Sequence, residues 1–216
     1  RPDGSEVKSG DPKEYLYTMP YSTIAKYDVG KRPSPDWPGK EQSPAIKPLA
    51  TELIDSVENY VKANGLDPMR YNIEIKCRKG KDEGKNWPEY HEFVDKCMEL
   101  LLSKNLGDRL VVQCIDPRAL NYMHEKYPQV KLSYLIRKMD TDWDTYMGRL
   151  NFTPDWLSPE FVIVDQTMVD NCRKAGIRLV PWTVDNEADI RRILDLHVEA
   201  IITNYPDRVL KITRGY

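Results

Sequence analysis

From residue 48 onward the chain alternates between strand-like and helix-like segments, and this alternation constrains the fold more than any other feature. Six strand-like runs lie at 71–76, 109–115, 131–136, 156–164, 179–184 and 200–205. Each run is followed by a helix or a helix-like stretch, a repetition that predicts a parallel sheet with helices outside it. Two architectures fit, an open doubly wound sheet and a (β/α) barrel, and in both of them ligands bind beyond the C-terminal ends of the strands. Within 156–164, either the run WLS or the run FVIV forms the strand.

The first 50 residues differ from the rest because they contain eight of the sixteen prolines. Proline removes a backbone donor and fixes φ, so such a segment resists both helix and central strand. A long segment of this kind is usually a functional loop or disordered. Its aromatic residues, which include Tyr15, Tyr17, Tyr21 and Tyr27, favour a segment that packs on the rest of the chain, with a disordered tail as the alternative.

Composition excludes several function classes. The net charge of −2 and the pI near 6.0 give no electrostatic basis for binding nucleic acid or an anionic membrane. No apolar run approaches the roughly 20 residues that a membrane span needs. Neither glycine-rich nucleotide motif occurs. The four cysteines lack a C-x-x-C pair, which argues against zinc, and we expect them to be mostly buried small apolar residues.

Polar side chains lie at the predicted C-terminal ends of several strands. In the run YNIEIK, Asn72, Glu74 and Lys76 share one face because successive strand side chains point to opposite sides. Glu74 could hold a hard divalent cation, and Lys76 could meet a phosphate as a point charge. Gln113 and Trp182 end two other strands, and the indole could form an apolar wall. The alternative is that Glu74 and Lys76 form only a surface ion pair, a contact that contributes about 0–1 kcal/mol.

The three histidines are not predicted to lie at strand ends. His91 and His124 fall within helices, and His197 lies in the link that enters the last strand. Phosphoryl chemistry at neutral pH needs a general acid and base, most often histidine. No second carboxylate stands near Glu74 in the sequence as a convincing metal partner, so the residues present amount to half of a site.

Three stretches, YNIEIK, VVQCIDPRALNYMHEKYPQVKLSYL and LVPWTVDNEADIRRILDLHVEAIITNYPD, resemble the glycerophosphodiester phosphodiesterases. The resemblance covers the chain from about Pro48 to its C-terminus and implies a (β/α)8 TIM barrel. It implies that Glu74 binds a divalent metal, Ca²⁺ or Mg²⁺, that Lys76 contacts the phosphate, and that Trp182 lines the substrate pocket. Gln113 stands where relatives often carry a polar or aromatic group, which makes it a further substrate-binding candidate.

The resemblance also implies a single domain over 1–216, with 1–47 as a proline-rich insertion that covers the site and 48–216 as the barrel. The family's His-Arg-Gly, Glu-x-Asp and His-Asp motifs are absent. The six strands would then be strands 3 to 8 of the barrel. We therefore expect the catalytic histidines upstream of Arg1, and we expect the chain alone to be inactive.

The implied reaction is metal-dependent hydrolysis of a glycerophosphodiester to glycerol 3-phosphate and an alcohol, so the expected partner is a small-molecule substrate. The first alternative is a non-catalytic protein that binds a phosphate or glycerophosphoryl group, and the second is an open-sheet hydrolase unrelated to the family. Relatives occur inside and outside cells, and placement outside the cytoplasm is the expectation with the cytoplasm as the alternative. The sequence does not predict the alcohol released or the oligomeric state.

Overall fold

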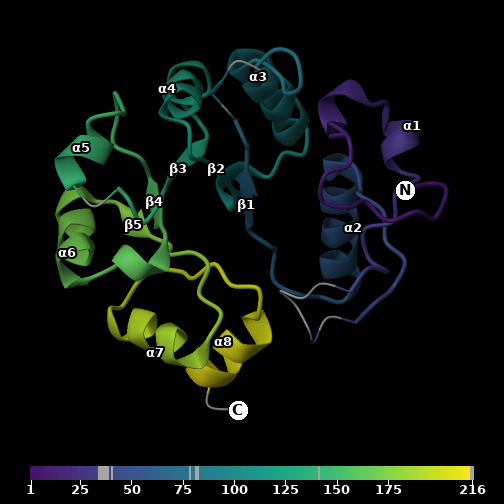
Figure 1. Cartoon of the computed structure of the whole chain (residues 1–216). Coiled ribbons are helices and arrows are strands. Elements are labelled where there is room, and N and C mark those ends of the chain that lie inside the picture. Colours follow the sequence, from purple (N-terminus) through teal and green to yellow (C-terminus); the bar gives the residue numbers. More distant parts are fainter. Residues whose placement is uncertain (34–38, 40, 78, 81–82, 141, 215–216) are drawn as a thin grey trace.

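The structure is a computed structural model that describes residues 1–33, 39, 41–77, 79–80, 83–140 and 142–214. Its sheet has five parallel strands in the order β1-β2-β3-β4-β5. The strands are β1 (Tyr71–Glu74), β2 (Leu110–Cys114), β3 (Lys131–Ile136), β4 (Trp156–Pro159) and β5 (Arg178–Leu179). The strands follow one another around a centre, and the helices lie outside them (Figure 1). The α/β class and the parallel sheet predicted from the alternation are confirmed.

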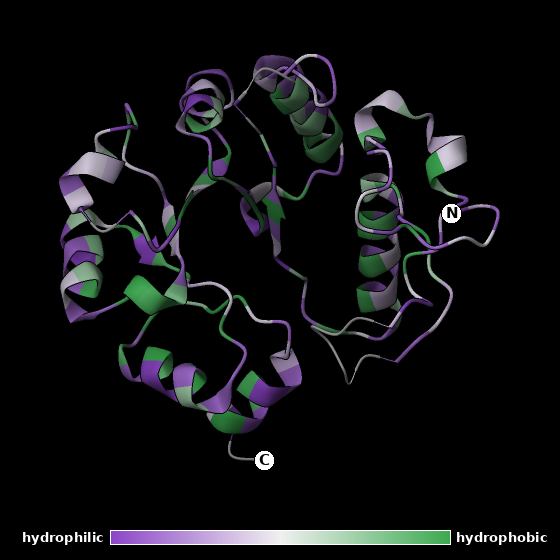
Figure 2. Cartoon of the chain, in the orientation of Figure 1, coloured by the Kyte–Doolittle hydropathy of each residue, from purple (hydrophilic) through white to green (hydrophobic). Residues whose placement is uncertain are grey.

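Helices between successive strands cover the outer face of the sheet, and further helices precede β1 and follow β5. The α-helices are α1 (Tyr21–Ile24), α2 (Ala50–Ala63), α3 (Tyr90–Leu102), α4 (Pro117–Lys126), α5 (Trp143–Met147), α6 (Gln166–Ala175), α7 (Glu187–Asp195) and α8 (Pro206–Arg214). Short 3-10 helices are η1 (Leu16–Thr18), η2 (Gly107–Arg109) and η3 (Phe161–Ile163). Most of the helices carry both hydrophobic and hydrophilic segments, as expected of helices with one face on a core (Figure 2).

Local sequence signals explain where several helices begin and end. Asp116 and Asn186 are residue types that favour the position before a helix, and they accept hydrogen bonds from the backbone N–H groups of Arg118 and Asp189. Helix α6 ends at Gly176, whose φ of 69° is a left-handed conformation that glycine adopts without strain. Within the described residues, no helix is both long enough and apolar enough to cross a bilayer.

The hydrophobic core lies between the outer face of the sheet and the helices. Val112, Leu132, Tyr134, Leu157 and Leu179 point to this side from four strands, and each is at most 2% exposed. These positions alternate with residues on the opposite side of each strand, as the period of two requires. The opposite side, here called the inner face, therefore carries the residues that remain for a site.

The last two predicted strands are shorter or absent. Strand β5 ends at Leu179, and Pro181 two residues later has no N–H to donate to a ladder. The segment 200–205 is not a strand, so the prediction of six strands is wrong in this respect. Its backbone still pairs with the chain after β5, because Ile202 N–H donates to Pro181 O at 2.9 Å and Val184 N–H donates to Ile202 O at 2.9 Å.

The proline-rich segment makes contacts with the region that follows β1. Tyr15 packs edge-on against Trp87 with ring centroids 5.3 Å apart, and the Tyr17 hydroxyl lies 3.5 Å from a carboxylate oxygen of Glu92. Positions 34–38 and 40 of the predicted cover lie outside the described residues. That the segment 1–47 covers the site stays a prediction, and so does the division into 1–47 and 48–216.

Candidate functional site

A buried polar layer crosses the inner face below the C-terminal ends of the strands. Asn72 on β1 donates from Nδ2 to Gln113 Oε1 on β2 at 3.0 Å. The Ser158 hydroxyl on β4 lies 3.4 Å from the same Gln113 oxygen and donates to Val180 O at 3.0 Å. Gln113 is 8% exposed and Ser158 is 0% exposed. The layer therefore joins side chains from three strands and fixes the floor of any site above it.

Glu74 and Lys76 lie together at the edge of the inner face, as the alternation predicts. Glu74 pairs in register with Gln113, while Ile75 and Cys77 are buried on the other side of the segment. Lys76 Nζ lies 2.6 Å from Glu74 Oε2, and the lysine side chain is 70% exposed. The two residues thus do form an ion pair. An ammonium has three N–H donors, so two donors of Lys76 remain for a ligand.

Trp182 is held on the same face by its ring nitrogen. Its Nε1 donates to Ser158 O at 2.8 Å, and its backbone pairs with Glu160 in a parallel bridge. The indole is therefore fixed next to the polar layer, where one side of the ring can form an apolar wall against a ligand. Gln113 is placed more deeply than predicted, because its side-chain oxygen is used by Asn72 and Ser158. Its amide nitrogen has no hydrogen-bond partner among the described residues, so any contact of Gln113 with substrate rests on that nitrogen.

Sequence reasoning missed Ser158 and Glu160. They belong to the alternation Trp156, Ser158, Glu160, which places all three on the inner face. The signal was present, but it could be used only once β4 was known to be the run that starts at Trp156 rather than the run at 161–164. Glu160 is half-buried and accepts a hydrogen bond at 2.9 Å from the backbone N–H of Lys138.

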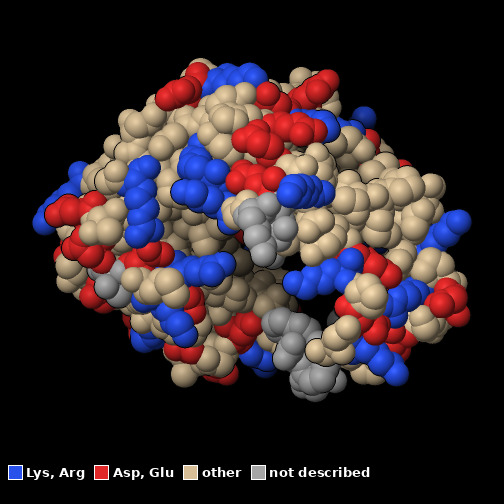
Figure 3. Space-filling model, turned by 45° about the horizontal axis from the view of Figure 1, so that its top comes forward, with Lys and Arg blue, Asp and Glu red and all other residues tan. Residues whose placement is uncertain are grey.

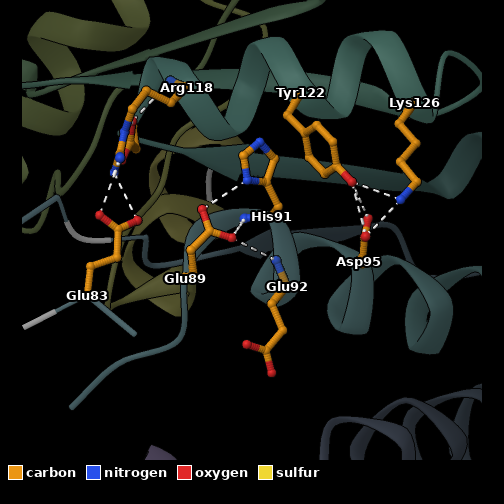
Figure 4. A network of polar contacts seen from close by, with 9 residues as sticks. Glu83, Glu89, His91, Glu92, Asp95, Arg118, Tyr122 and Lys126 are labelled. Carbon is orange, nitrogen blue, oxygen red and sulfur yellow. Dashed lines mark hydrogen bonds and ion pairs between the residues drawn. The ribbon is translucent and has the colours of Figure 1, made fainter. Parts of the chain in front are cut away.

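The loop after β1 is fastened to the start of α4. Arg118 donates to both carboxylate oxygens of Glu83 at 3.3 Å and binds Asp116 at 2.7 Å (Figure 4). Its guanidinium also lies over the Tyr90 ring, 4.5 Å from the ring centroid. The hydrogen bonds that Arg118 donates to Asp116 and Glu83, with burial opposing them, raise the pKa of Arg118, so it stays charged. This contact holds the loop beside the strand ends.

Thr203 and Asn204, in the segment 200–205, are hydrogen-bonded to Asp185. Asp185 accepts from the Thr203 hydroxyl at 3.1 Å and from the Asn204 side-chain amide at 2.9 Å. Burial raises the pKa of Asp185, but the hydrogen bonds from Asn204 and Thr203 outweigh it and hold the pKa below its usual range. These groups bond to one another, and they fasten the chain that follows β5 to the start of α8.

The three histidines lie away from the strand ends, as predicted. His91 is on α3, where its Nδ1 lies 2.9 Å from Glu89 Oε1 (Figure 4). His124 is on α4 and stacks on Phe152 at 4.1 Å, and His197 is in the link between α7 and 200–205. The described residues therefore place no histidine beside Glu74 and Lys76.

The described residues do not form a complete metal site. No group of three or more His, Cys, Asp or Glu side chains among them is arranged to hold a metal ion. Glu74 offers carboxylate oxygens, the ligand type that Ca²⁺ and Mg²⁺ prefer, but one carboxylate alone is too few for such an ion. In Figure 3 the molecule is hollowed near the middle of the view, and side chains of both charge signs border the hollow. That surface does not present a field of a single sign.

The cysteines are free thiols and carry no site. Cys77, Cys114 and Cys172 are buried and Cys97 is partly buried, which confirms the predicted packing role. Burial raises the pKa of Cys97 to about 11 and that of Cys172 to about 12, so both stay protonated at neutral pH.

Comparison with known proteins identifies relatives across nearly the whole chain. The model of the glycerophosphoryl diester phosphodiesterase family matches residues 5–208. A glycerophosphodiester phosphodiesterase of Bacillus subtilis (strain 168) is 29% identical over 120 residues, which make up 55% of this chain. The chain spans only 41% of the length of that relative.

Solved structures show the same fold. A Silicibacter pomeroyi structure assigned to the glycerophosphoryl diester phosphodiesterases aligns with 99% of this chain and 74% of its own, with a TM-score of 0.79 and 20% identity. A phosphodiesterase from Oleispira antarctica, in complex with the product sn-glycerol-3-phosphate, aligns over 94% of this chain and 74% of its own, with a TM-score of 0.68 and 19% identity. At such low identity the likeness shows the fold, an α/β structure of TIM-barrel type, and not the residues of the site.

Proposed function

Because the chain belongs to the glycerophosphoryl diester phosphodiesterase family, we propose that it takes part in the hydrolysis of a glycerophosphodiester to glycerol 3-phosphate and an alcohol. The observation that carries the proposal is the pairing of Glu74 with Lys76 at the C-terminal edge of the inner face. Ligands of parallel α/β folds bind at this edge. The product complex of the Oleispira antarctica phosphodiesterase supports a glycerophosphoryl ligand for this fold.

Each side chain has a role that follows from its contacts. Lys76 keeps two N–H donors for the phosphate and offsets negative charge that grows on its oxygens during hydrolysis. The Gln113 amide nitrogen offers one more donor from the buried layer. Trp182, fixed by Ser158, forms an apolar wall for the organic part of the substrate. Glu74 orients Lys76 through its oxygen Oε2, and its other carboxylate oxygen is offered to a divalent cation.

The proposal includes groups that the described residues do not supply. Ca²⁺ or Mg²⁺ would take Glu74 as one oxygen ligand, with further ligands from elsewhere. The general acid and base would be histidines upstream of Arg1, and the strands of this chain would correspond to barrel strands from the third onward. The contacts of Glu74, Lys76, Gln113 and Trp182 do not depend on the metal ion or on the upstream histidines.

The test compares two lysines in similar ion pairs. Lys76→Met removes the proposed phosphate ligand, and Lys96→Met removes a lysine of α3 that pairs with Glu92 at the same 2.6 Å and is 67% exposed, against 70% for Lys76. Glycerol 3-phosphate released from sn-glycero-3-phosphoglycerol is measured with a coupled dehydrogenase. In the full-length protein we expect Lys76→Met to lower kcat/KM by roughly 100-fold or more, and Lys96→Met to leave it unchanged. Equal rates for the two variants would contradict the role given to Lys76.

A non-catalytic role is the second candidate, and the position of the histidines favours it. The described residues at the strand ends include no histidine, and a phosphate-binding protein would need only Lys76 and Trp182. Such a protein would bind glycerol 3-phosphate without turning over a diester, and Lys76→Met would abolish the binding. Calorimetry with glycerol 3-phosphate, run beside the hydrolysis assay, separates the two functions.

A further inference from the structure

Glu160 and Trp182 lie side by side on the inner face, and the proposed reaction gives Glu160 no task. Their backbones form a parallel bridge, in which Trp182 N–H donates to Pro159 O at 2.9 Å and Phe161 N–H donates to Trp182 O at 2.7 Å. Bridge partners in a parallel pair point to the same side of the sheet. A carboxylate and an indole are thereby presented together at the ends of β4 and of the segment after β5.

The Glu160 carboxylate is positioned by a hydrogen bond, but it has no counter-ion within the part of the chain that the structure describes. Its Oε2 accepts the 2.9 Å hydrogen bond from the Lys138 backbone, which fixes the direction of the side chain. Among the described residues no lysine, arginine or histidine forms an ion pair with it, whereas Glu74, Glu83, Asp116 and Asp140 each have such a partner. A half-buried carboxylate with one free oxygen favours a cation as its ligand.

Trp182 offers the second element that a cation binds. Indole is the aromatic ring with the strongest attraction for ammonium groups, and the attraction increases as water is excluded. The ring nitrogen Nε1 donates to Ser158 O at 2.8 Å, and Ser158 is 0% exposed, so the ring is preorganised. A carboxylate beside a fixed indole matches a quaternary or primary ammonium group.

The two ends of the inner face are separated by a suitable length. Lys76 follows β1 and Glu160 follows β4, three strand steps apart in the sheet order. At about 4.8 Å for each step this is roughly 14 Å along the sheet, and the straight line is shorter because the strands curve around a centre (Figure 1). Side chains that reach inward from both ends reduce the gap further. One extended small molecule can therefore place a phosphate at Lys76 and a cation at Glu160.

We propose that Glu160 is a specificity-determining residue, which with Trp182 binds the ammonium group of the alcohol in a glycerophosphodiester. Esters of amino alcohols are then preferred to esters of neutral alcohols. The inference rests on the proposed function for the reaction, but the cation site itself can be tested without turnover.

The test uses two substrates that differ only in the alcohol, sn-glycero-3-phosphocholine and sn-glycero-3-phosphoglycerol. The variant is Glu160→Gln, which keeps an oxygen for the Lys138 N–H and removes the charge. Glu99→Gln, which removes an exposed carboxylate from α3, is the matched control. Glu160→Gln should lower kcat/KM for the choline ester about tenfold and change the glycerol ester less than twofold. The control should change neither substrate.

Binding of choline chloride alone, measured by calorimetry, separates failure of this inference from failure of the proposed function. The assays use the full-length protein, since this chain alone is expected to be inactive. If that protein hydrolyses neither ester, the proposed function fails, and the cation site stands only if choline binds the wild type and not Glu160→Gln. If both esters are hydrolysed with equal kcat/KM by the wild type, or if Glu160→Gln affects both equally, the inference is overturned while the reaction stands. Absence of choline binding to the wild type also overturns it.

Discussion

Two buried serines on the inner face provide a sharp test of the polar layer, because they differ only in hydrogen bonding. Ser158 and Ser133 are both 0% exposed and lie on the neighbouring strands β4 and β3. The Ser158 hydroxyl donates to Val180 O at 3.0 Å, whereas the Ser133 hydroxyl has no partner among the described residues. Replacing either serine by alanine removes one oxygen of the same size, so the packing loss is similar in both variants.

The expected difference follows from what each hydroxyl leaves behind. Ser158→Ala leaves the Val180 carbonyl buried without its donor, which costs about 1–3 kcal/mol of the free energy of unfolding. Ser133→Ala removes a buried hydroxyl that gains nothing from the fold, so stability should stay the same or rise. In a protein of this size each kcal/mol shifts Tm by roughly 2–4 °C, so the two variants should differ by roughly 2–12 °C.

Thermal unfolding gives Tm and urea unfolding gives the midpoint and m-value; both are monitored by circular dichroism for the two variants and the wild type at one pH. Equal m-values are required, so that a change in midpoint reports a change in stability. If Ser133→Ala is destabilised as much as Ser158→Ala, then the Ser133 hydroxyl has a partner such as buried water. The inference that the Ser133 hydroxyl contributes nothing to stability would then be refuted.

Two further predictions concern other parts of the chain. Hydrogen bonds from Arg109 and then from Tyr71 lower the pKa of Glu58 from its usual 4.5 to about 2, so its stabilising contribution is complete above pH 4.5 and is lost as the pH falls toward 2. Glu58→Gln should therefore flatten the fall in urea midpoint between pH 5 and pH 2. An unchanged slope would show that Glu58 does not cause this loss of stability. A Cβ at the buried Gly30 would lie 2.0 Å from the Ser43 carbonyl oxygen, whereas a Cβ at Gly39 meets nothing within 4 Å. Gly30→Ala should therefore speed proteolysis of the proline-rich segment, and Gly39→Ala should not. Equal cleavage rates would show that the segment does not hold this packing in solution.

Much of the outer architecture could be predicted because its signals are local. The alternation of strand and helix periods, the caps Asp116 and Asn186, and the proline at the start of α8 each act within a few residues. The sixth strand could not be predicted correctly, because its existence depends on a partner. The apolar run at 200–205 reads as a strand, but Pro181 on the neighbouring segment removes a donor that a regular ladder would need.

By itself the sequence determined that Glu74 and Lys76 would share one face of a strand, since a period of two decides that within a single segment. Only the tertiary structure decided which side chains from other strands meet them. Asn72 and Gln113 are 41 residues apart in the chain, and Ser158 and Val180 are 22 apart, yet each pair is hydrogen-bonded. Such contacts depend on the register between strands, and a shift of one residue would turn Glu160 and Ser158 to the opposite face. Register is set by pairing between distant segments, which no local pattern in the sequence records.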